Sequence, residues 1–308
     1  MSDVTVAAAL RSNAHLVVIE APAGCGKTHQ AADYAHWLAT APEARQVLIL
    51  THTHAACDVF RSRTASVRRQ VQITTIDGLV AQIAGTYHLA LGLPADTTDW
   101  VRNQGQNGFE QLALKVADLL SWSLAIRSML VNRYPIIICD EHQDASAAQH
   151  RVLMQLFEAG ARLRVFGDPV QAIYIRGKAA RQAHEKQWKE LTERADINDK
   201  LDYPHRWTGG SIELGQWVLE AREALKSGYP IDLRGCLPSG LDVISADNIS
   251  PQPMGFRLEL IPGRKVSATI RNADSMMVLA GQNGTVRAIG AFLGRSIPIW
   301  EGHMLAPM

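Results

Sequence analysis

Residues 21–28 form a glycine-containing run that ends in a lysine and a hydroxyl residue, between an apolar stretch and a helical pattern. Backbone N–H groups in such a turn surround phosphate oxygens, and the positive end of the following helix attracts the same anion. In this pattern Lys27 reaches the β- and γ-phosphates and the Thr28 hydroxyl binds Mg²⁺. Ala21 replaces the usual first glycine, but two glycines remain for the turns. The predicted nucleotide-binding residues are Ala23, Gly24, Cys25, Gly26, Lys27 and Thr28.

A second motif, residues 136–144, is an apolar run that ends in acidic residues. Asp140 at the end of the run can complete the Mg²⁺ shell, and Glu141 is placed to polarise a water molecule for attack on the γ-phosphate. A metabolic kinase does not favour this second carboxylate, because it promotes transfer to water. The motif therefore indicates hydrolysis of a nucleoside triphosphate.

A third motif, residues 165–174, follows the next apolar run and contains Gln171. The side-chain amide of Gln171 offers two donors and an acceptor, which suits it to sensing whether a γ-phosphate is present.

The elements that must position these side chains are short aliphatic or β-branched runs that alternate with helical patterns. They span residues 16–19, 47–50, 71–74, 136–139 and 163–166. The runs are continuous rather than alternating, which predicts a mostly parallel α/β sheet with helices on both faces. Ligand groups in such a fold gather at the carboxyl ends of the strands. The phosphate loop, Thr51, Asp140 and Asp168 are therefore expected at one edge of the sheet.

The composition narrows the possible partners. The chain has 308 residues with 31 basic and 30 acidic side chains, so binding of nucleic acid requires a local basic surface rather than a global field. Arg61, Arg63, Arg68 and Arg69 could form such a surface or simply a solvated helix face. Four widely separated cysteines do not indicate disulfides or a metal site, and the absence of a long apolar run argues against a membrane partner. We expect a cytoplasmic protein.

The chain divides into two predicted parts at residues 1–185 and 186–308. Residues 84–133 have a helical pattern with a polar interruption, which indicates a small helical insertion or else a long crossover connection. In the second part we predict strands at 276–279 and 297–299, with a helix over 285–293 between them.

Together these motifs resemble the UvrD/Rep family of superfamily 1 DNA helicases. The resemblance rests on residues 21–28, 140–144 and 167–174, which stand in the order of the family's motifs. Residues 51–63 and 74–78 are similar to its DNA-contacting motifs, and residues 201–207 are similar to the segment that opens its second motor domain. The resemblance implies a P-loop NTPase (RecA-like) motor domain followed by a partial second one.

It also implies an Mg²⁺-dependent ATPase that acts on single-stranded DNA. Arg206 takes the position of an arginine finger, which in such enzymes stabilises the transition-state charge. The family's DNA-contacting positions correspond to His52, Thr75 and Arg176. His52 and Arg176 stand where the family usually has aromatic side chains that stack on bases, and both are weaker platforms.

The sequence also departs from the family in ways that favour a second interpretation. The adenine-contacting glutamine upstream of the phosphate loop has no counterpart, and nothing after Trp300 resembles the two late motifs that couple DNA to ATP. The alternative function is a nucleotide-dependent DNA-binding or regulatory switch, for example a subunit that works with a nuclease or another protein, binding ATP without unwinding DNA.

Overall fold

The computed structural model describes residues 2–41, 46–172, 177–233, 235–243, 249–252, 255–258, 260–272, 277 and 289–290. The chain divides into two compact units, Met1–Ile231 and Asp232–Met308. Among the described residues, no helix combines the length and the apolar character that crossing a membrane requires.

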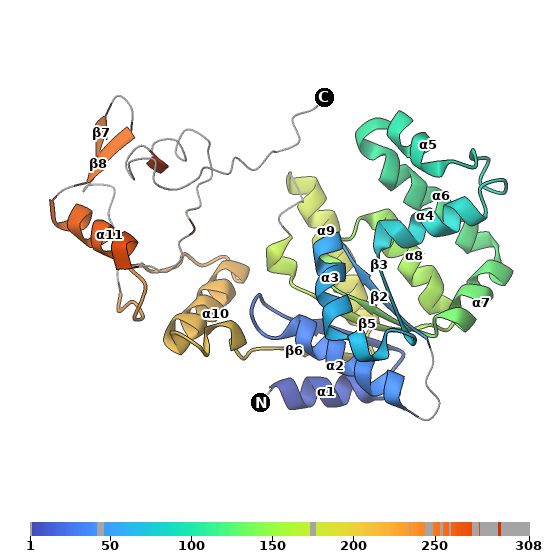
Figure 1. The fold of residues 1–308 in the computed structure, drawn as a ribbon, viewed down its shortest axis with the longest axis horizontal. Helices are drawn as coiled ribbons and strands as arrows, with labels where there is room; N and C mark the ends of the chain where they lie inside the picture. The colour runs from blue at the N-terminus through green and yellow to red at the C-terminus, as the bar shows by residue number, and fades with distance from the viewer. Residues whose placement is uncertain are drawn as a thin grey trace. The chain divides into compact units, whose positions relative to one another are not determined.

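A six-stranded parallel sheet is the centre of the first unit (Figure 1). Its strand order is β3-β2-β4-β5-β1-β6. The strands are β1 (Leu16–Glu20), β2 (Val47–Thr51), β3 (Val71–Thr75), β4 (Ile136–Cys139), β5 (Arg162–Gly167) and β6 (Ile197–Lys200). The first five coincide with the five predicted apolar runs. β6 was not predicted because this edge strand buries little and its sequence is mostly polar.

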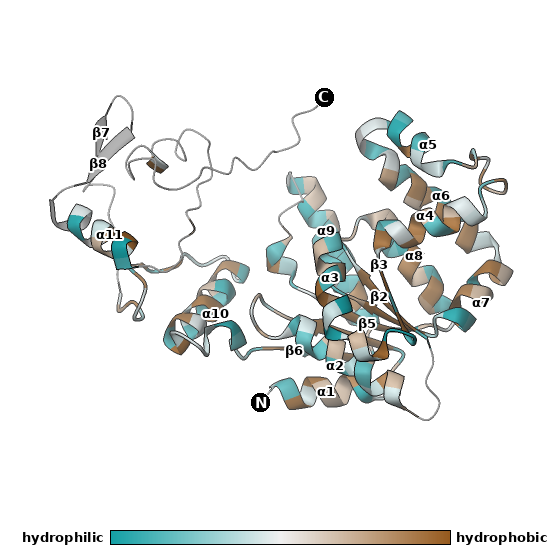
Figure 2. Ribbon diagram, viewed as in Figure 1, coloured by the Kyte–Doolittle hydropathy of each residue, from teal (hydrophilic) through white to brown (hydrophobic). Residues whose placement is uncertain are grey.

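Helices cover both faces of this sheet, as the continuous apolar runs predict. The helices outside the 84–133 segment are α1 (Ser2–Arg11), α2 (Lys27–Thr40), α3 (His54–Arg63), α4 (Ile76–Thr86), α8 (Ala147–Glu158), α9 (Lys178–Arg194) and α10 (Ile212–Lys226). On β1, Leu16 and Val18 join a core with α4 and α8, whereas Val17 and Ile19 join a second core with α1 and α2. β2, whose five residues are all buried, is accordingly coloured as hydrophobic in Figure 2.

Residues 84–133 are mainly helical, as predicted. After α4 come α5 (Thr97–Asn103), η2 (Gly105–Asn107), α6 (Gly108–Trp122) and α7 (Leu124–Arg133). Leu112, Val116 and Leu120 of α6 are buried in the same core as α4 and α8. These helices therefore belong to the packed body of the first unit.

In the second unit, β7 (Ile249–Gln252) and β8 (Gly255–Leu258) form an antiparallel pair that is followed by α11 (Leu260–Asn272). The strands predicted at 276–279 and 297–299, and the helix between them, lie outside the described residues apart from 277, 289 and 290. The predicted boundary at 185/186 falls within α9, and the first unit continues to Ile231. A second RecA-like domain stays a prediction.

Candidate nucleotide-binding site

The phosphate loop connects the end of β1 to the start of α2. Gly24 and Gly26 have φ angles of 79° and 87°, in the left-handed region that favours glycine. Gly26 is the N-cap of α2, and no side chain caps this helix end. The first N–H groups of a 14-residue helix are therefore not used by a capping side chain, and the helix dipole adds positive potential there. The loop has the geometry of an anion site.

The short helix η5 (His205–Trp207) packs on this loop from far along the chain. The Arg206 backbone N–H donates to the Gly24 carbonyl at 3.0 Å. A Cβ atom at Gly24 would lie 2.7 Å from a Trp207 ring carbon and 2.8 Å from the Arg206 Cβ. The Arg206 side chain is exposed beside the phosphate loop. Its role as an arginine finger stays a prediction.

This close approach predicts that Gly24→Ala destabilises the protein. The substitution adds a strained left-handed alanine and an overlap with η5, so we expect the free energy of unfolding to fall by about 2–5 kcal/mol. Denaturant unfolding monitored by circular dichroism measures this change.

Gly228→Ala is the matched control. Gly228 has a similar φ of 75°, but an added Cβ would meet no atom within 4 Å, so we expect a loss of only about 1–2 kcal/mol. Equal losses in the two variants would show that η5 does not hold the loop closely.

The acidic motif meets the phosphate loop through an ion pair between Lys27 and Glu141. Lys27 is buried, whereas the Glu141 side chain is 36% exposed. Glu141 has a φ of 53°, which makes it the one non-glycine residue in the left-handed region within the described part of the chain. Such backbone strain of about 1–3 kcal/mol is typical of functional positions.

Asp140 is buried at the end of β4, and its Oδ1 atom has no hydrogen-bond partner among the described residues. Burial raises its pKa to about 7, although the nearby Lys27 charge lowers it. Mg²⁺ prefers oxygen ligands such as carboxylates, so an unpartnered buried carboxylate oxygen fits this cation. Asp140 and Thr28, which lies in the first turn of α2, are the residues that would hold Mg²⁺.

Hydrogen bonds join the acidic motif to the third motif. Gln143 donates to Glu141 Oε2 at 2.8 Å, and its own Oε1 accepts from the Asp168 backbone N–H at 2.9 Å. Gln171, in η4 (Pro169–Gln171), donates its amide to Asp168 Oδ2 at 2.6 Å. Gln171 is therefore linked to Glu141 through two intervening residues, Asp168 and Gln143.

Three groups of functional interest were not found from the sequence. Arg222 of α10 is buried against Asp168 and Glu20. The ring of His142, buried in η3 (His142–Asp144), shares a 3.0 Å hydrogen bond with His150, and burial lowers the pKa of both. Asp144 has an unpartnered Oδ1, and burial raises its pKa to about 6. The sequence signals only that these side chains are polar, not that they are buried.

The predicted DNA-contacting residues fall at the ends of two neighbouring strands. His52 follows β2, and burial lowers its pKa, so the ring favours its neutral form. Thr75 ends β3 opposite Thr51 and caps α4 by accepting from the Gly78 N–H at 3.0 Å. Arg176 lies outside the described residues.

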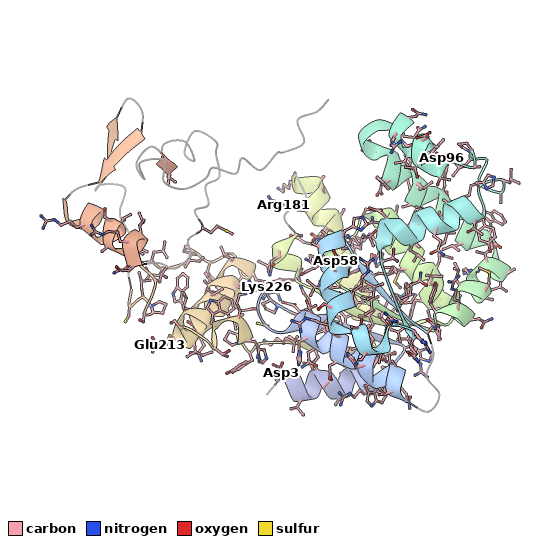
Figure 3. All side chains as sticks on the ribbon, viewed as in Figure 1. Asp3, Asp58, Asp96, Arg181, Glu213 and Lys226 are labelled. Carbon is pink, nitrogen blue, oxygen red and sulfur yellow. The ribbon has the colours of Figure 1, made fainter. Side chains whose placement is uncertain are left out.

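The basic cluster of Arg61, Arg63, Arg68 and Arg69 is exposed, on and just after α3. Arg61 pairs with Asp58, which is labelled in Figure 3. Within the described part of the chain Arg63, Arg68 and Arg69 form no ion pair, so the cluster keeps much of its positive charge at the surface. Their contact with a nucleic acid stays a prediction.

The parallel sheet, the phosphate loop after β1 and the carboxylates at the end of β4 define an α/β P-loop nucleotide-binding domain. Residues 5–177 match the family described as AAA domain (AAA_19), and the chain belongs to this family. It is also 34% identical over 104 residues to the RecBCD enzyme subunit RecB of Mycolicibacterium smegmatis. That match covers 31% of this chain and 10% of the relative's length.

Proposed function

We propose that this chain is the ATPase motor region of a UvrD/Rep-like DNA helicase that acts on single-stranded DNA. The observation that carries this proposal is the meeting of Lys27, the Asp140–Glu141 pair and the Gln171 segment at one edge of the sheet. The family and the similarity to RecB support it.

In this proposal the Lys27–Glu141 pair separates when ATP binds. Lys27 then pairs with the γ-phosphate instead of Glu141, so that Glu141 can accept a proton from the attacking water. Mg²⁺ at Asp140 and Thr28 would supply charge that stabilises the phosphate oxygens. Gln171 and Arg206 would contact the γ-phosphate, which requires Gln171 to leave Asp168.

Single-stranded DNA would run along the edge formed by the ends of β2 and β3. His52 and Thr75 lie there, and Arg176 would belong to the same track. The neighbouring arginines of α3 would attract phosphates in a salt-dependent manner.

The similarity to a protein described as an enzyme subunit also supports a second candidate. In this alternative the chain is a nucleotide-dependent DNA-binding or regulatory switch within a complex that includes another protein, for example a nuclease. It would bind ATP without unwinding DNA.

The ATPase rate with and without single-stranded DNA separates the two candidates. The motor predicts a rate that rises severalfold with a single-stranded oligonucleotide and less with a blunt duplex of the same length. A basal hydrolysis rate that neither the oligonucleotide nor the duplex changes would favour the switch. No hydrolysis in any condition would contradict the assignment of Glu141 as the group that activates water.

A further inference from the structure

Arg222 of α10 holds two acidic side chains at the site edge of the sheet. Its guanidinium donates to Asp168 Oδ1 at 2.7 Å and to Glu20 Oε1 at 2.6 Å. The Arg222 side chain is 9% exposed, and that of Asp168 is fully buried. Burial lowers the pKa of Arg222, but the hydrogen bonds that Arg222 donates to Asp168 and Glu20 outweigh this effect and raise the pKa. Arg222 therefore stays charged.

The two acids stand at the ends of neighbouring strands, where Glu20 of β1 is paired in register with Gly167 of β5. Glu20 directly precedes the phosphate loop, and Asp168 begins the turn that carries Gln171. Arg222 thus connects α10 to the two segments that would meet the phosphates.

Asp168 is shared between Arg222 and Gln171. Its carboxylate accepts from the Gln171 amide at 2.6 Å and from the Val170 N–H at 3.1 Å, while Arg222 bonds to the same group. If Gln171 turns toward a γ-phosphate, Asp168 loses one donor, and a buried carboxylate compensates by strengthening its remaining contact. A change in the contact between Gln171 and Asp168 would therefore alter the contact between Asp168 and Arg222.

Lys226 provides a contrast on the same helix. Lys226, which is labelled in Figure 3, lies one turn after Arg222, and among the described residues its ammonium group bonds to the Glu20 carboxylate alone, at 2.8 and 3.0 Å. Its side chain is 43% exposed, and its ammonium group bonds to Glu20 rather than to Asp168. Lys226 can fasten α10 to β1 but not to Gln171.

We propose that Arg222 is a positioning residue that couples nucleotide state at Gln171 to α10. This inference rests on the proposed function, because it requires that Gln171 respond to a γ-phosphate. α10 is the last helix of the first unit and ends six residues before the second unit begins at Asp232. Movement of α10 would therefore be the output of nucleotide binding.

The test compares the affinities of the full chain for a non-hydrolysable ATP analogue and for ADP, both with Mg²⁺. Arg222→Lys keeps the charge but cannot span two carboxylates, so we expect the ratio of the two affinities to fall by about tenfold, within the usual range for coupled sites. General structural damage would weaken both ligands alike. Lys226→Met is the matched control and should leave the ratio unchanged.

A double-mutant comparison with Gln171→Ala tests whether the coupling runs through Asp168. If the two residues act through Asp168, Arg222→Lys has little further effect on the ratio once Gln171→Ala is present. Fully additive effects, or an unchanged ratio in Arg222→Lys alone, would overturn the inference. If the wild type binds neither nucleotide, the proposed function is wrong and the inference falls with it.

Amide hydrogen exchange measured on the wild-type protein tests the same coupling and does not require that the Arg222→Lys variant folds. We expect the amides of residues 212–226 to change protection between the ATP analogue and ADP. If each nucleotide binds but the amides of α10 exchange identically in the two complexes, the coupling is overturned. The assignment of the nucleotide site is then unaffected.

Discussion

Glu141→Gln is expected to abolish turnover while the protein still binds ATP. The amide cannot accept the proton of the attacking water, and loss of a general base typically lowers the rate by about 10²–10⁴-fold. Its oxygen can still accept a hydrogen bond from Lys27, so the contact that joins the acidic motif to the phosphate loop is retained in part. Phosphate release measured beside equilibrium binding of an ATP analogue separates the two effects.

Glu193→Gln is a suitable control, because Glu193 is an exposed residue of α9 that pairs with Lys189. This variant should hydrolyse ATP at the wild-type rate. Undiminished hydrolysis in Glu141→Gln would mean that another group activates water. Asp144 would then be the next candidate, since burial raises its pKa to about 6 and one of its oxygens has no partner among the described residues.

Much of the sheet could be predicted because burial on both faces leaves a simple pattern. Ile136–Cys139 is buried at each position, and an uninterrupted aliphatic run of that length is typical of a central parallel strand. The parallel topology then brings the ends of β1, β4 and β5 to one edge. Lys27 and Glu141, which are 114 residues apart in the sequence, meet there as a result.

The parts that could not be predicted depend on long-range charge pairing. Residues 212–225 have a helical pattern, but nothing local in that pattern distinguishes Arg222 from an ordinary solvated arginine. Its burial follows from Asp168 and Glu20, which are 54 and 202 residues away. Arg164 was not predicted for a related reason, because it is buried on β5 and its long-range partners are backbone carbonyl groups 150 to 154 residues away, at and after the end of α1.

Lys27→Met should lower the affinity for Mg²⁺-ATP by about 10- to 100-fold, because it removes charge-assisted hydrogen bonds worth about 1.5–3 kcal/mol. The methionine replaces a buried aliphatic stem with one of similar length, so the fold should persist. Lys27 also lowers the pKa of Asp140, and its removal should move that pKa further upward. Calorimetric titration with an ATP analogue measures the affinity.

Lys189→Met, on the exposed face of α9, is the control and should bind the analogue as the wild type does. Comparison with Glu141→Gln distinguishes a structural role from a functional one, because Lys27 and Glu141 are partners in one ion pair. If that pair had only a structural role, both substitutions would affect binding and turnover together. In a phosphate site the lysine governs binding and the glutamate governs turnover. Unchanged affinity in Lys27→Met would therefore place the nucleotide elsewhere and contradict the site itself.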